Sequence, residues 1–305
     1  MYSPKMTIPK SSKTRQRVNS EGRIIKSVGG IYEVETADGN YNCKARGVFR
    51  SKGISPYTGD FVRISAEENA EPVIEEIFPR KNELIRPPMA NLDAVLLVIS
   101  ACEPFPNAYV IDKLTAVFES KGIETVPVFT KQDKSDSGQL IEVYESLGYR
   151  CFRVDNTTGQ GTDDIKAYIN GKTTALIGNS GVGKSSLINC IFPELARATG
   201  EISKKLGRGR HTTREVTLYR LGDGYIADTP GFSTVEVNRY IDIPKEELKY
   251  CFREMAEAEC RFSNCVHLKE AGCTVREKLA AGEIAKSRYE SYERMYSELS
   301  AAERY

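Results

Sequence analysis

Eight residues near the middle of the chain indicate the fold class of its central domain: Gly178-Asn179-Ser180-Gly181-Val182-Gly183-Lys184-Ser185. They match the P-loop pattern, in which a glycine-rich turn between a strand and a helix surrounds phosphate groups with backbone amides. The apolar segment 174–177 precedes the turn, and a helix over 184–191 is predicted after it. We expect the residues from Gly178 to Ser186 to bind the phosphates of a nucleotide, with Lys184 on the β- and γ-phosphate oxygens and Ser185 on Mg²⁺.

The segments on either side of this loop alternate between apolar strands and helices. Strands are predicted over residues 95–100, 125–129, 150–154 and 174–177, and helices over residues 108–121, 138–147, 162–170 and 184–191. Such an alternation is typical of a parallel sheet covered by helices on both faces. We therefore expect an α/β P-loop domain over residues 81–238, after a linker over residues 80–88. Thr162 is the expected N-cap of one of its helices.

A second phosphate-side motif, Asp228-Thr229-Pro230-Gly231, ends a predicted strand. Asp228 suits a water-mediated contact to Mg²⁺, and the Gly231 amide could bond the γ-phosphate. The basic loop 207–214 lies between the two motifs, where a switch loop belongs. One of its threonines should reach Mg²⁺ when the γ-phosphate is bound, and Thr213 is favoured over Thr212. A plain basic surface loop is the alternative.

The tetrapeptide Thr130-Lys131-Gln132-Asp133 indicates guanine as the base. It resembles the Asn-Lys-x-Asp motif of GTPases, and the Asp133 carboxylate can accept hydrogen bonds from N1 and N2 of guanine, a donor pair that adenine lacks. Lys131 would pack its stem on the ring. Thr130 keeps a hydroxyl but lacks the amide of the usual asparagine, which predicts a weaker connection to the P-loop. Asn156 follows the next strand, where the backbone of GTPases contacts the guanine oxygen, so it joins the predicted nucleotide site.

The order of these motifs is informative. In an ordinary GTPase the P-loop comes first and the guanine motifs come last, whereas here the guanine motifs precede the P-loop. This order predicts a circularly permuted domain with the same sheet, because domain termini that lie close together can be rejoined. The chain after Gly231 then leads directly into a C-terminal region over residues 239–305.

That C-terminal region carries a predicted metal site. Three of the eight cysteines crowd around one of the two histidines, as Cys260, Cys265, His267 and Cys273. Three thiolates and one imidazole form a closed tetrahedral zinc site without a position for water, so we expect a structural zinc ion in a helical domain. The other five cysteines are scattered, which is typical of a reducing cytosol. Coincidental thiols in a helix are the alternative.

The N-terminal region divides into an arm and a barrel. Residues 1–17 are polar and basic, which predicts either a disordered solvated tail or an arm that meets nucleic acid. Residues 18–80 contain five short β-prone segments separated by turn signals, which predicts a small barrel of the OB-fold class. OB-folds commonly bind nucleic acid, although a barrel with another ligand, or with none, has the same pattern. No apolar run approaches the roughly 20 residues of a membrane span.

Together these features resemble the ribosome small-subunit-dependent GTPase A family, from about residue 18 to residue 305. The resemblance is carried by Arg86-Pro87-Pro88 with Ala90-Asn91-x-Asp93, GNSGVGKSSLIN (178–189), GRGRHTT (207–213), DTPGFS (228–233) and CRFSNCVHLKEAGC (260–273). The chain departs from the family pattern at Thr130, at Asp155-Asn156, and at Ala271, where proline is common.

The resemblance implies a multidomain protein with an N-terminal OB-fold, a central circularly permuted GTPase domain and a C-terminal zinc domain. It further implies binding to the small ribosomal subunit and its rRNA, a role in late maturation of the subunit, and GTP hydrolysis stimulated by it. GTP or GDP, Mg²⁺ and one Zn²⁺ would be the cofactors of a cytoplasmic monomer. Three alternatives remain open: a P-loop kinase or ATPase, an RNA-binding scaffold with little turnover, and a permuted GTPase acting on another RNA particle.

The group that orients the attacking water is not the usual one. Many small GTPases place a glutamine directly after the Asp-x-x-Gly motif for this purpose, but here Phe232 occupies that position. His211 is the best candidate, because it lies in the predicted switch loop and imidazole suits proton handling near neutral pH. The predicted catalytic residues are therefore His211, Lys184 and Thr213. The alternative is that His211 only contacts RNA or solvent.

Overall fold

The structure is a computed structural model of the whole chain and describes residues 17–67, 70–135, 137–193, 216–229 and 242–302. It contains two compact units. The first consists of Met1–Pro56 with Asp60–Pro79, and the second of Tyr57–Gly59 with Arg80–Tyr305. Among the described residues, no helix combines the length and the apolar character that a membrane span requires.

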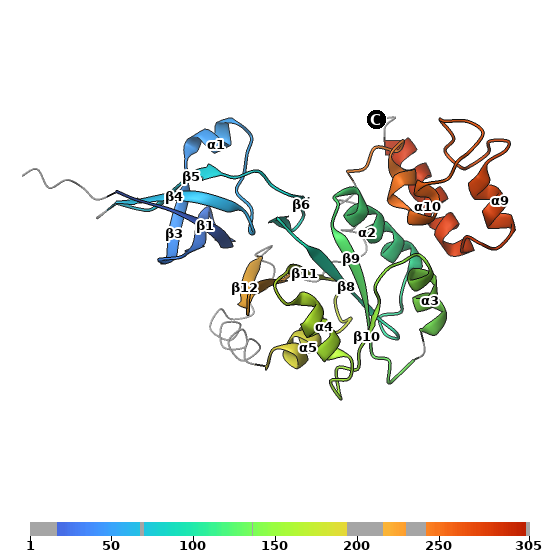
Figure 1. Cartoon of the computed structure of the whole chain (residues 1–305), viewed down its shortest axis with the longest axis horizontal. Helices are drawn as coiled ribbons and strands as arrows, with labels where there is room; N and C mark the ends of the chain where they lie inside the picture. Colours follow the sequence, from blue (N-terminus) through green and yellow to red (C-terminus); the bar gives the residue numbers. More distant parts are fainter. Residues whose placement is uncertain (1–16, 68–69, 136, 194–215, 230–241, 303–305) are drawn as a thin grey trace, which may run out of the picture. The chain divides into compact units, whose positions relative to one another are not determined.

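The first unit is a five-stranded barrel, as the turn signals predicted. Its strands are β1 (Arg17–Val28), β2 (Ile31–Thr36), β3 (Gly39–Ala45), β4 (Phe61–Glu67) and β5 (Val73–Ile77), with the short helix α1 (Gly47–Ser51) between β3 and β4 (Figure 1). All neighbouring strands are antiparallel except the pair β3–β5, and the pairing of β1 with β4 closes the barrel. Alternate residues of these strands fill its core: Ile24, Val34, Cys43, Val62, Ile64 and Ile74.

The second unit contains the predicted α/β domain. Its sheet has the order β10-β9-β8-β11-β13-β12, and its strands are β8 (Ala94–Ser100), β9 (Glu124–Thr130), β10 (Phe152–Arg153), β11 (Thr173–Ile177), β12 (Thr217–Leu221) and β13 (Gly224–Asp228). All neighbours are parallel except β12 and β13, which are antiparallel. Among the described residues, the helices between the strands are α2 (Ala108–Ser120), α3 (Gly138–Ser146), α4 (Thr162–Ile169) and α5 (Lys184–Ile191).

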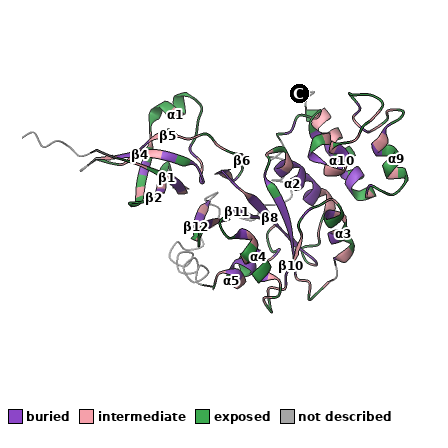
Figure 2. Cartoon of the chain, in the orientation of Figure 1, coloured by how far each residue is buried: buried purple, intermediate pink, exposed green. Residues whose placement is uncertain are grey.

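The central strands have the composition of a doubly covered sheet. Every residue of β8 and of β11 is buried, and β8 appears entirely as buried chain in Figure 2. Such strands read as continuous apolar runs because both of their faces are covered. In a parallel sheet, the carboxyl ends of neighbouring strands lie at one edge, and ligands bind there. The segments after β8, β9, β10 and β11 therefore meet at the same edge of the sheet.

Two local predictions were wrong. The predicted linker over residues 80–88 contains a strand, since β6 (Glu83–Ile85) pairs with β7 (Pro88–Ala90) in a small antiparallel hairpin. The N-cap of α4 is Gly161 and not Thr162. Gly161 has a φ of 79°, and a Cβ there would lie 2.1 Å from the carbonyl oxygen of Arg153, so only glycine fits.

The C-terminal helices of the described chain are η2 (Leu248–Cys251), α8 (Arg253–Ala256), α9 (Thr274–Ala280) and α10 (Lys286–Ala302). Of these, α10 and η2 lie against α2, and a buried ion pair joins α10 to α2. Arg288 of α10 is 1% exposed and donates to Asp112 Oδ1 of α2 at 2.6 Å and to Glu254 Oε1 at 2.7 Å. Tyr144 of α3 also donates to Asp112, at 2.7 Å. The C-terminal helices and the α/β domain thus share one buried polar network.

Candidate active site

The phosphate loop joins the buried strand β11 to α5. Gly181 and Gly183 have φ values of 81° and 100°, which glycine adopts without strain. Gly178 has no space for a side chain, because a Cβ there would lie 2.5 Å from the carbonyl oxygen of Val98. Gly183 is the N-cap of α5, so the free backbone amides of the helix N-terminus continue those of the loop. This cradle fits a phosphate chain.

The lysine of this loop is folded back over it. Lys184 is 8% exposed, and its Nζ donates to the carbonyl oxygens of Gly178 at 2.6 Å and of Asn179 at 2.8 Å. These bonds hold the positive charge of the ammonium group directly on the loop, where it would neutralise the negative charge of bound phosphate oxygens. Ser185 and Ser186, in the first turn of α5, are exposed.

The start of the guanine-type tetrapeptide touches the phosphate loop directly. The buried hydroxyl of Thr130 donates to the carbonyl oxygen of Val182 at 2.6 Å. Lys131 Nζ donates to the carbonyl oxygen of Gly181 at 3.0 Å and also to that of Glu103. The Thr130 hydroxyl thus connects the tetrapeptide to the loop, and whether this connection is weaker than that of the usual asparagine stays a prediction.

Asp133 lies in the turn that follows these contacts. The turn is closed by the Lys134 amide, which donates to the carbonyl oxygen of Lys131 at 3.0 Å. The Asp133 side chain is exposed. The structure thus places the first two residues of the tetrapeptide against the phosphate loop and Asp133 in the turn just beyond them.

The segment after β10 reaches the phosphate loop through a side chain. Asn156 Nδ2 donates to the carbonyl oxygen of Gly183 at 3.3 Å. The preceding residue shapes this segment, since the Asp155 carboxylate accepts from Thr158 Oγ1 at 2.6 Å and from the Thr157 amide at 2.7 Å, and these bonds lower the pKa of Asp155. Only a backbone role was expected at this position, so the carboxamide of Asn156 is a contact that sequence reasoning missed.

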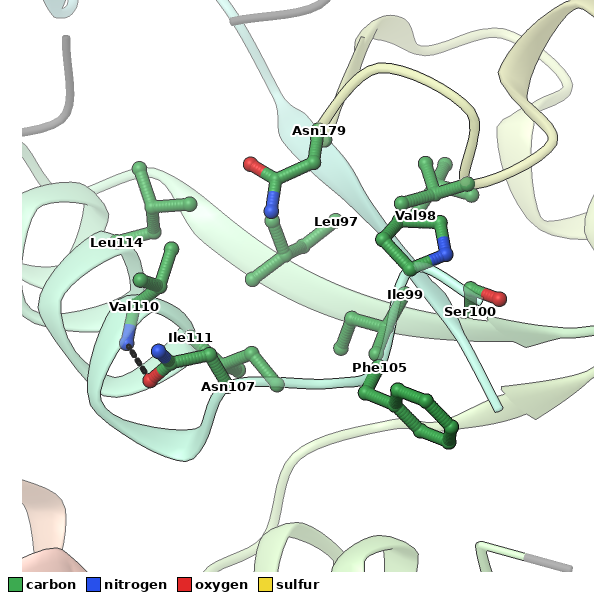
Figure 3. A pocket seen from close by; sticks show the side chains of 13 residues that line it. Leu97, Val98, Ile99, Ser100, Phe105, Asn107, Val110, Ile111, Leu114 and Asn179 are labelled. Carbon is green, nitrogen blue, oxygen red and sulfur yellow. Dashed lines mark hydrogen bonds between the residues drawn. The ribbon is translucent and has the colours of Figure 1, made fainter. Parts of the chain in front are cut away.

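An apolar hollow lies behind the phosphate loop, between β8 and the beginning of α2 (Figure 3). Much of its wall is aliphatic, with side chains that include those of Leu97, Ile99, Val110, Ile111 and Leu114. Asn107 caps α2 at its edge, with Oδ1 accepting from the Val110 amide at 3.3 Å. Gly178, Asn179 and Val182 of the phosphate loop also line the hollow, so it adjoins the nucleotide cradle.

Several predicted residues lie outside the part of the chain that the structure describes. They are residues 1–16 of the arm, the loop 207–214 with His211, Thr212 and Thr213, and Gly231 and Phe232 together with the predicted boundary between residues 238 and 239. Asp228 is the last residue of β13, and its backbone lies opposite Leu176 of β11, one strand from the phosphate loop.

The four predicted zinc ligands lie together. His267 Nδ1 is 3.4 Å from the Sγ atom of Cys260 and 3.5 Å from those of Cys265 and Cys273, and the sulfurs of Cys260 and Cys273 are 3.9 Å apart. In a tetrahedron with Zn–S near 2.3 Å and Zn–N near 2.05 Å, these edges would measure about 3.6 Å and about 3.8 Å. The cluster therefore fits one zinc ion coordinated through Nδ1 of the histidine.

Residues that the sequence analysis did not single out hold the backbone of this cluster. His267 has a positive φ of 61°, and its carbonyl oxygen accepts from Tyr289 Oη of α10 at 2.8 Å. Tyr292 Oη donates to the carbonyl oxygen of Val266, also at 2.8 Å. The Glu270 carboxylate accepts from three backbone amides of the same turn, those of Val266, Leu268 and Lys269. These contacts preorganise the ligand set.

Two of the remaining cysteines, Cys43 and Cys251, are buried structural thiols. All eight cysteines are described and free of disulfides. Burial raises the pKa of Cys43 to about 11 and that of Cys251 to about 12, so neither is a reactive thiolate near neutral pH.

Comparison with known proteins identifies the arrangement. A family model described as RsgA GTPase matches residues 77–238, and a second one, described as RsgA N-terminal domain, matches residues 21–74. The chain belongs to the RsgA GTPase family. The resemblance inferred from the motifs is thereby confirmed, and the chain is a GTP-hydrolysing enzyme.

RsgA relatives match along almost their whole length. The small ribosomal subunit biogenesis GTPase RsgA of Carboxydothermus hydrogenoformans is 44% identical over 290 residues, which cover 93% of this chain and 99% of the relative. The protein of the same name from Caldanaerobacter subterraneus subsp. tengcongensis is 42% identical over 290 residues, which cover 93% of this chain and 97% of the relative.

Solved structures agree with the permuted RsgA fold. YjeQ from Thermotoga maritima has a TM-score of 0.76 at 37% identity and covers 92% of this chain and 99% of its own. YloQ, described as a circularly permuted GTPase, has a TM-score of 0.75 at 33% identity and covers 97% of this chain and 99% of its own. The permutation predicted from the order of the motifs is thus confirmed.

Proposed function

We propose that this enzyme hydrolyses GTP on the small ribosomal subunit and acts in the late maturation of that subunit. The RsgA relatives are named for small-subunit biogenesis, which supports this partner. The observation that carries the nucleotide assignment is the direct bonding of Thr130 and Lys131, from the guanine-type motif, to the carbonyls of the phosphate loop. This geometry supports a single site in which one end holds the phosphates and the other reads the base.

We assign the residues of the site as follows. The amides from Gly178 to Ser186 bind the phosphates, and Gly231 contacts the γ-phosphate. Asp133 accepts hydrogen bonds from N1 and N2 of guanine, while Asn156 belongs to the segment beside the guanine oxygen. Ser185 and Thr213 would hold Mg²⁺, with Asp228 acting through water, and the ion would neutralise charge on the β- and γ-phosphates.

Hydrolysis transfers the γ-phosphoryl group to water and releases GDP and inorganic phosphate. Lys184 stabilises the charge that develops on the phosphate oxygens, because its ammonium is held on the loop by two carbonyls. We assign His211 to the orientation of the attacking water, since phenylalanine stands at the usual glutamine position. Binding to the subunit would act through the loop 207–214 and so accelerate a slow intrinsic reaction.

The other domains supply the surfaces for the subunit. We assign rRNA contacts to the basic arm, the barrel and the C-terminal domain, and one structural Zn²⁺ to Cys260, Cys265, His267 and Cys273. The close spacing of these four ligand atoms, all within 4.8 Å of one another, supports the zinc assignment. We further propose that the enzyme acts in the cytoplasm as a monomer.

Phosphate release and co-sedimentation test this function together. The purified chain is incubated with GTP and Mg²⁺, alone and with small or large ribosomal subunits, and a parallel sample with a non-hydrolysable GTP analogue is sedimented. We expect co-sedimentation with the small subunit only and faster phosphate release in its presence. Equal binding to both subunits, or turnover that small subunits do not change, would refute the proposed partner.

A further inference from the structure

Three successive carbonyl groups of the phosphate loop receive side-chain donors from the guanine side. Lys131 Nζ bonds the carbonyl oxygen of Gly181, Thr130 Oγ1 bonds that of Val182, and Asn156 Nδ2 bonds that of Gly183. The donors come from two segments, the one after β9 and the one after β10. The loop is therefore held along three peptide units from one side.

These three hydrogen bonds, together called the clamp, fix the direction of three backbone amides. In a trans peptide unit the C=O group and the following N–H group point in opposite directions. If the carbonyls of residues 181–183 point to the guanine-side segments, the amides of residues 182–184 point away from them, into the phosphate cradle. The Gly183 carbonyl also accepts from the Leu187 amide at 2.8 Å, which is the first hydrogen bond of α5, so the helix and the clamp act together on this peptide unit. Gly181 and Gly183 place little restriction on their own dihedral angles.

We propose that Asn156 is a positioning residue for the phosphates: its carboxamide holds the Gly183 carbonyl and thereby directs the Lys184 amide to the β-phosphate. The orientation of the carboxamide follows from its partner, because only the Nδ2 end can donate to a carbonyl oxygen. A Cβ built on Gly183 would lie 3.0 Å from Nδ2, so the two groups are in close contact. Asn156 supplies the amide that Thr130 lacks at the first position of the guanine-type motif.

The surroundings of Asn156 support this role. The segment is shaped by the Asp155 carboxylate, and Cys190 Sγ of α5 donates to the carbonyl oxygen of Asn156 at 2.9 Å. Asn156 Oδ1 is buried and has no hydrogen-bond partner among the described residues. An unpaired buried acceptor destabilises a fold, and an apolar side chain would avoid that cost. The presence of an amide therefore indicates that the donor end is what this position requires.

The positioning role of Asn156 rests on the proposed binding of guanine nucleotides by this loop. The test separates a failure of nucleotide binding from a failure of the positioning role. Asn156→Leu removes the donor at similar volume, and Asn42→Leu, at an exposed position of the barrel, is the matched control. GDP and GMP compete with a fluorescent GDP for the wild type and for both variants. GMP lacks the β-phosphate that the Lys184 amide would bind, so a positioning role predicts a selective loss for GDP.

We expect Asn156→Leu to weaken the affinity for GDP about tenfold, which corresponds to the free energy of one hydrogen bond, and to leave the affinity for GMP unchanged. Equal losses for GDP and GMP would show a role at the base and overturn the proposal, as would unchanged GDP binding. Failure of the wild type to bind GDP would instead refute the proposed nucleotide site. If Asn156→Leu does not fold, Asn156→Asp decides, because its carboxylate faces the Gly183 carbonyl and should reduce the GDP-to-GMP preference more strongly.

Discussion

Two buried threonines of β9 form a matched pair of positions. Comparing them measures how much the hydrogen bond between β9 and the phosphate loop contributes to stability and to nucleotide binding. The Thr130 hydroxyl donates to the Val182 carbonyl oxygen at 2.6 Å, whereas Thr125 Oγ1 is buried without a hydrogen-bond partner among the described residues. Both residues are at most 1% exposed. Valine keeps the β-branched shape in each position and leaves no cavity, so the hydroxyl is the only group that a Thr→Val change removes.

Thr130→Val should lower the free energy of unfolding by about 1–3 kcal/mol, because it removes a bond and leaves the buried Val182 carbonyl without that donor. Thr125→Val should be neutral or slightly stabilising, since it removes a hydroxyl that makes no bond. Urea unfolding of both nucleotide-free variants, followed by far-ultraviolet circular dichroism, gives the difference. Fluorescent GDP binding is measured in parallel, and we expect it to weaken only in Thr130→Val. Equal stability and equal GDP affinity of the two variants would refute the reasoning.

Three further predictions concern the other parts of the enzyme. Arg288→Met leaves the carboxylates of Asp112 and Glu254 buried without their cation, and should cost about 3–5 kcal/mol in urea unfolding; a loss below about 1 kcal/mol would contradict the buried network. Removal of zinc by a chelator should lower the helix content measured by circular dichroism, with one zinc released per chain on metal analysis, and an unchanged spectrum would argue against a structural ion. His211→Ala should abolish most of the acceleration by small subunits, and unchanged stimulated phosphate release would remove the histidine from the mechanism.

The sequence predicted the parts of the fold that depend on local pattern. The β8 segment is recognisable because a strand covered on both faces is apolar throughout, and the phosphate loop because its glycines stand at fixed spacing. The zinc ligands cluster within a short segment, so their spacing was visible as well. In each case the decisive residues are close together along the chain.

The remaining site contacts join residues that are distant in the sequence. Thr130 and Val182 are 52 positions apart, Asn156 and Gly183 are 27 apart, and Tyr289 is 22 positions from the His267 carbonyl that it bonds. Such pairs leave no periodic signal, because each depends on the register of strands or helices that meet only in the folded chain. For the same reason the bond from the Thr130 hydroxyl to the Val182 carbonyl was not predicted, since it depends on the position of β9.

The central claim is that a guanine-reading carboxylate and the phosphate loop act on one nucleotide, and base specificity tests it most directly. In xanthine an oxygen acceptor replaces the N2 donor of guanine, so an asparagine amide at position 133 complements it and a carboxylate does not. Hydrolysis of GTP and of xanthosine triphosphate is measured for the wild type and for Asp133→Asn. The account predicts a strong GTP preference in the wild type and a reversed preference in the variant; an Asp133→Asn enzyme that still prefers GTP would contradict it.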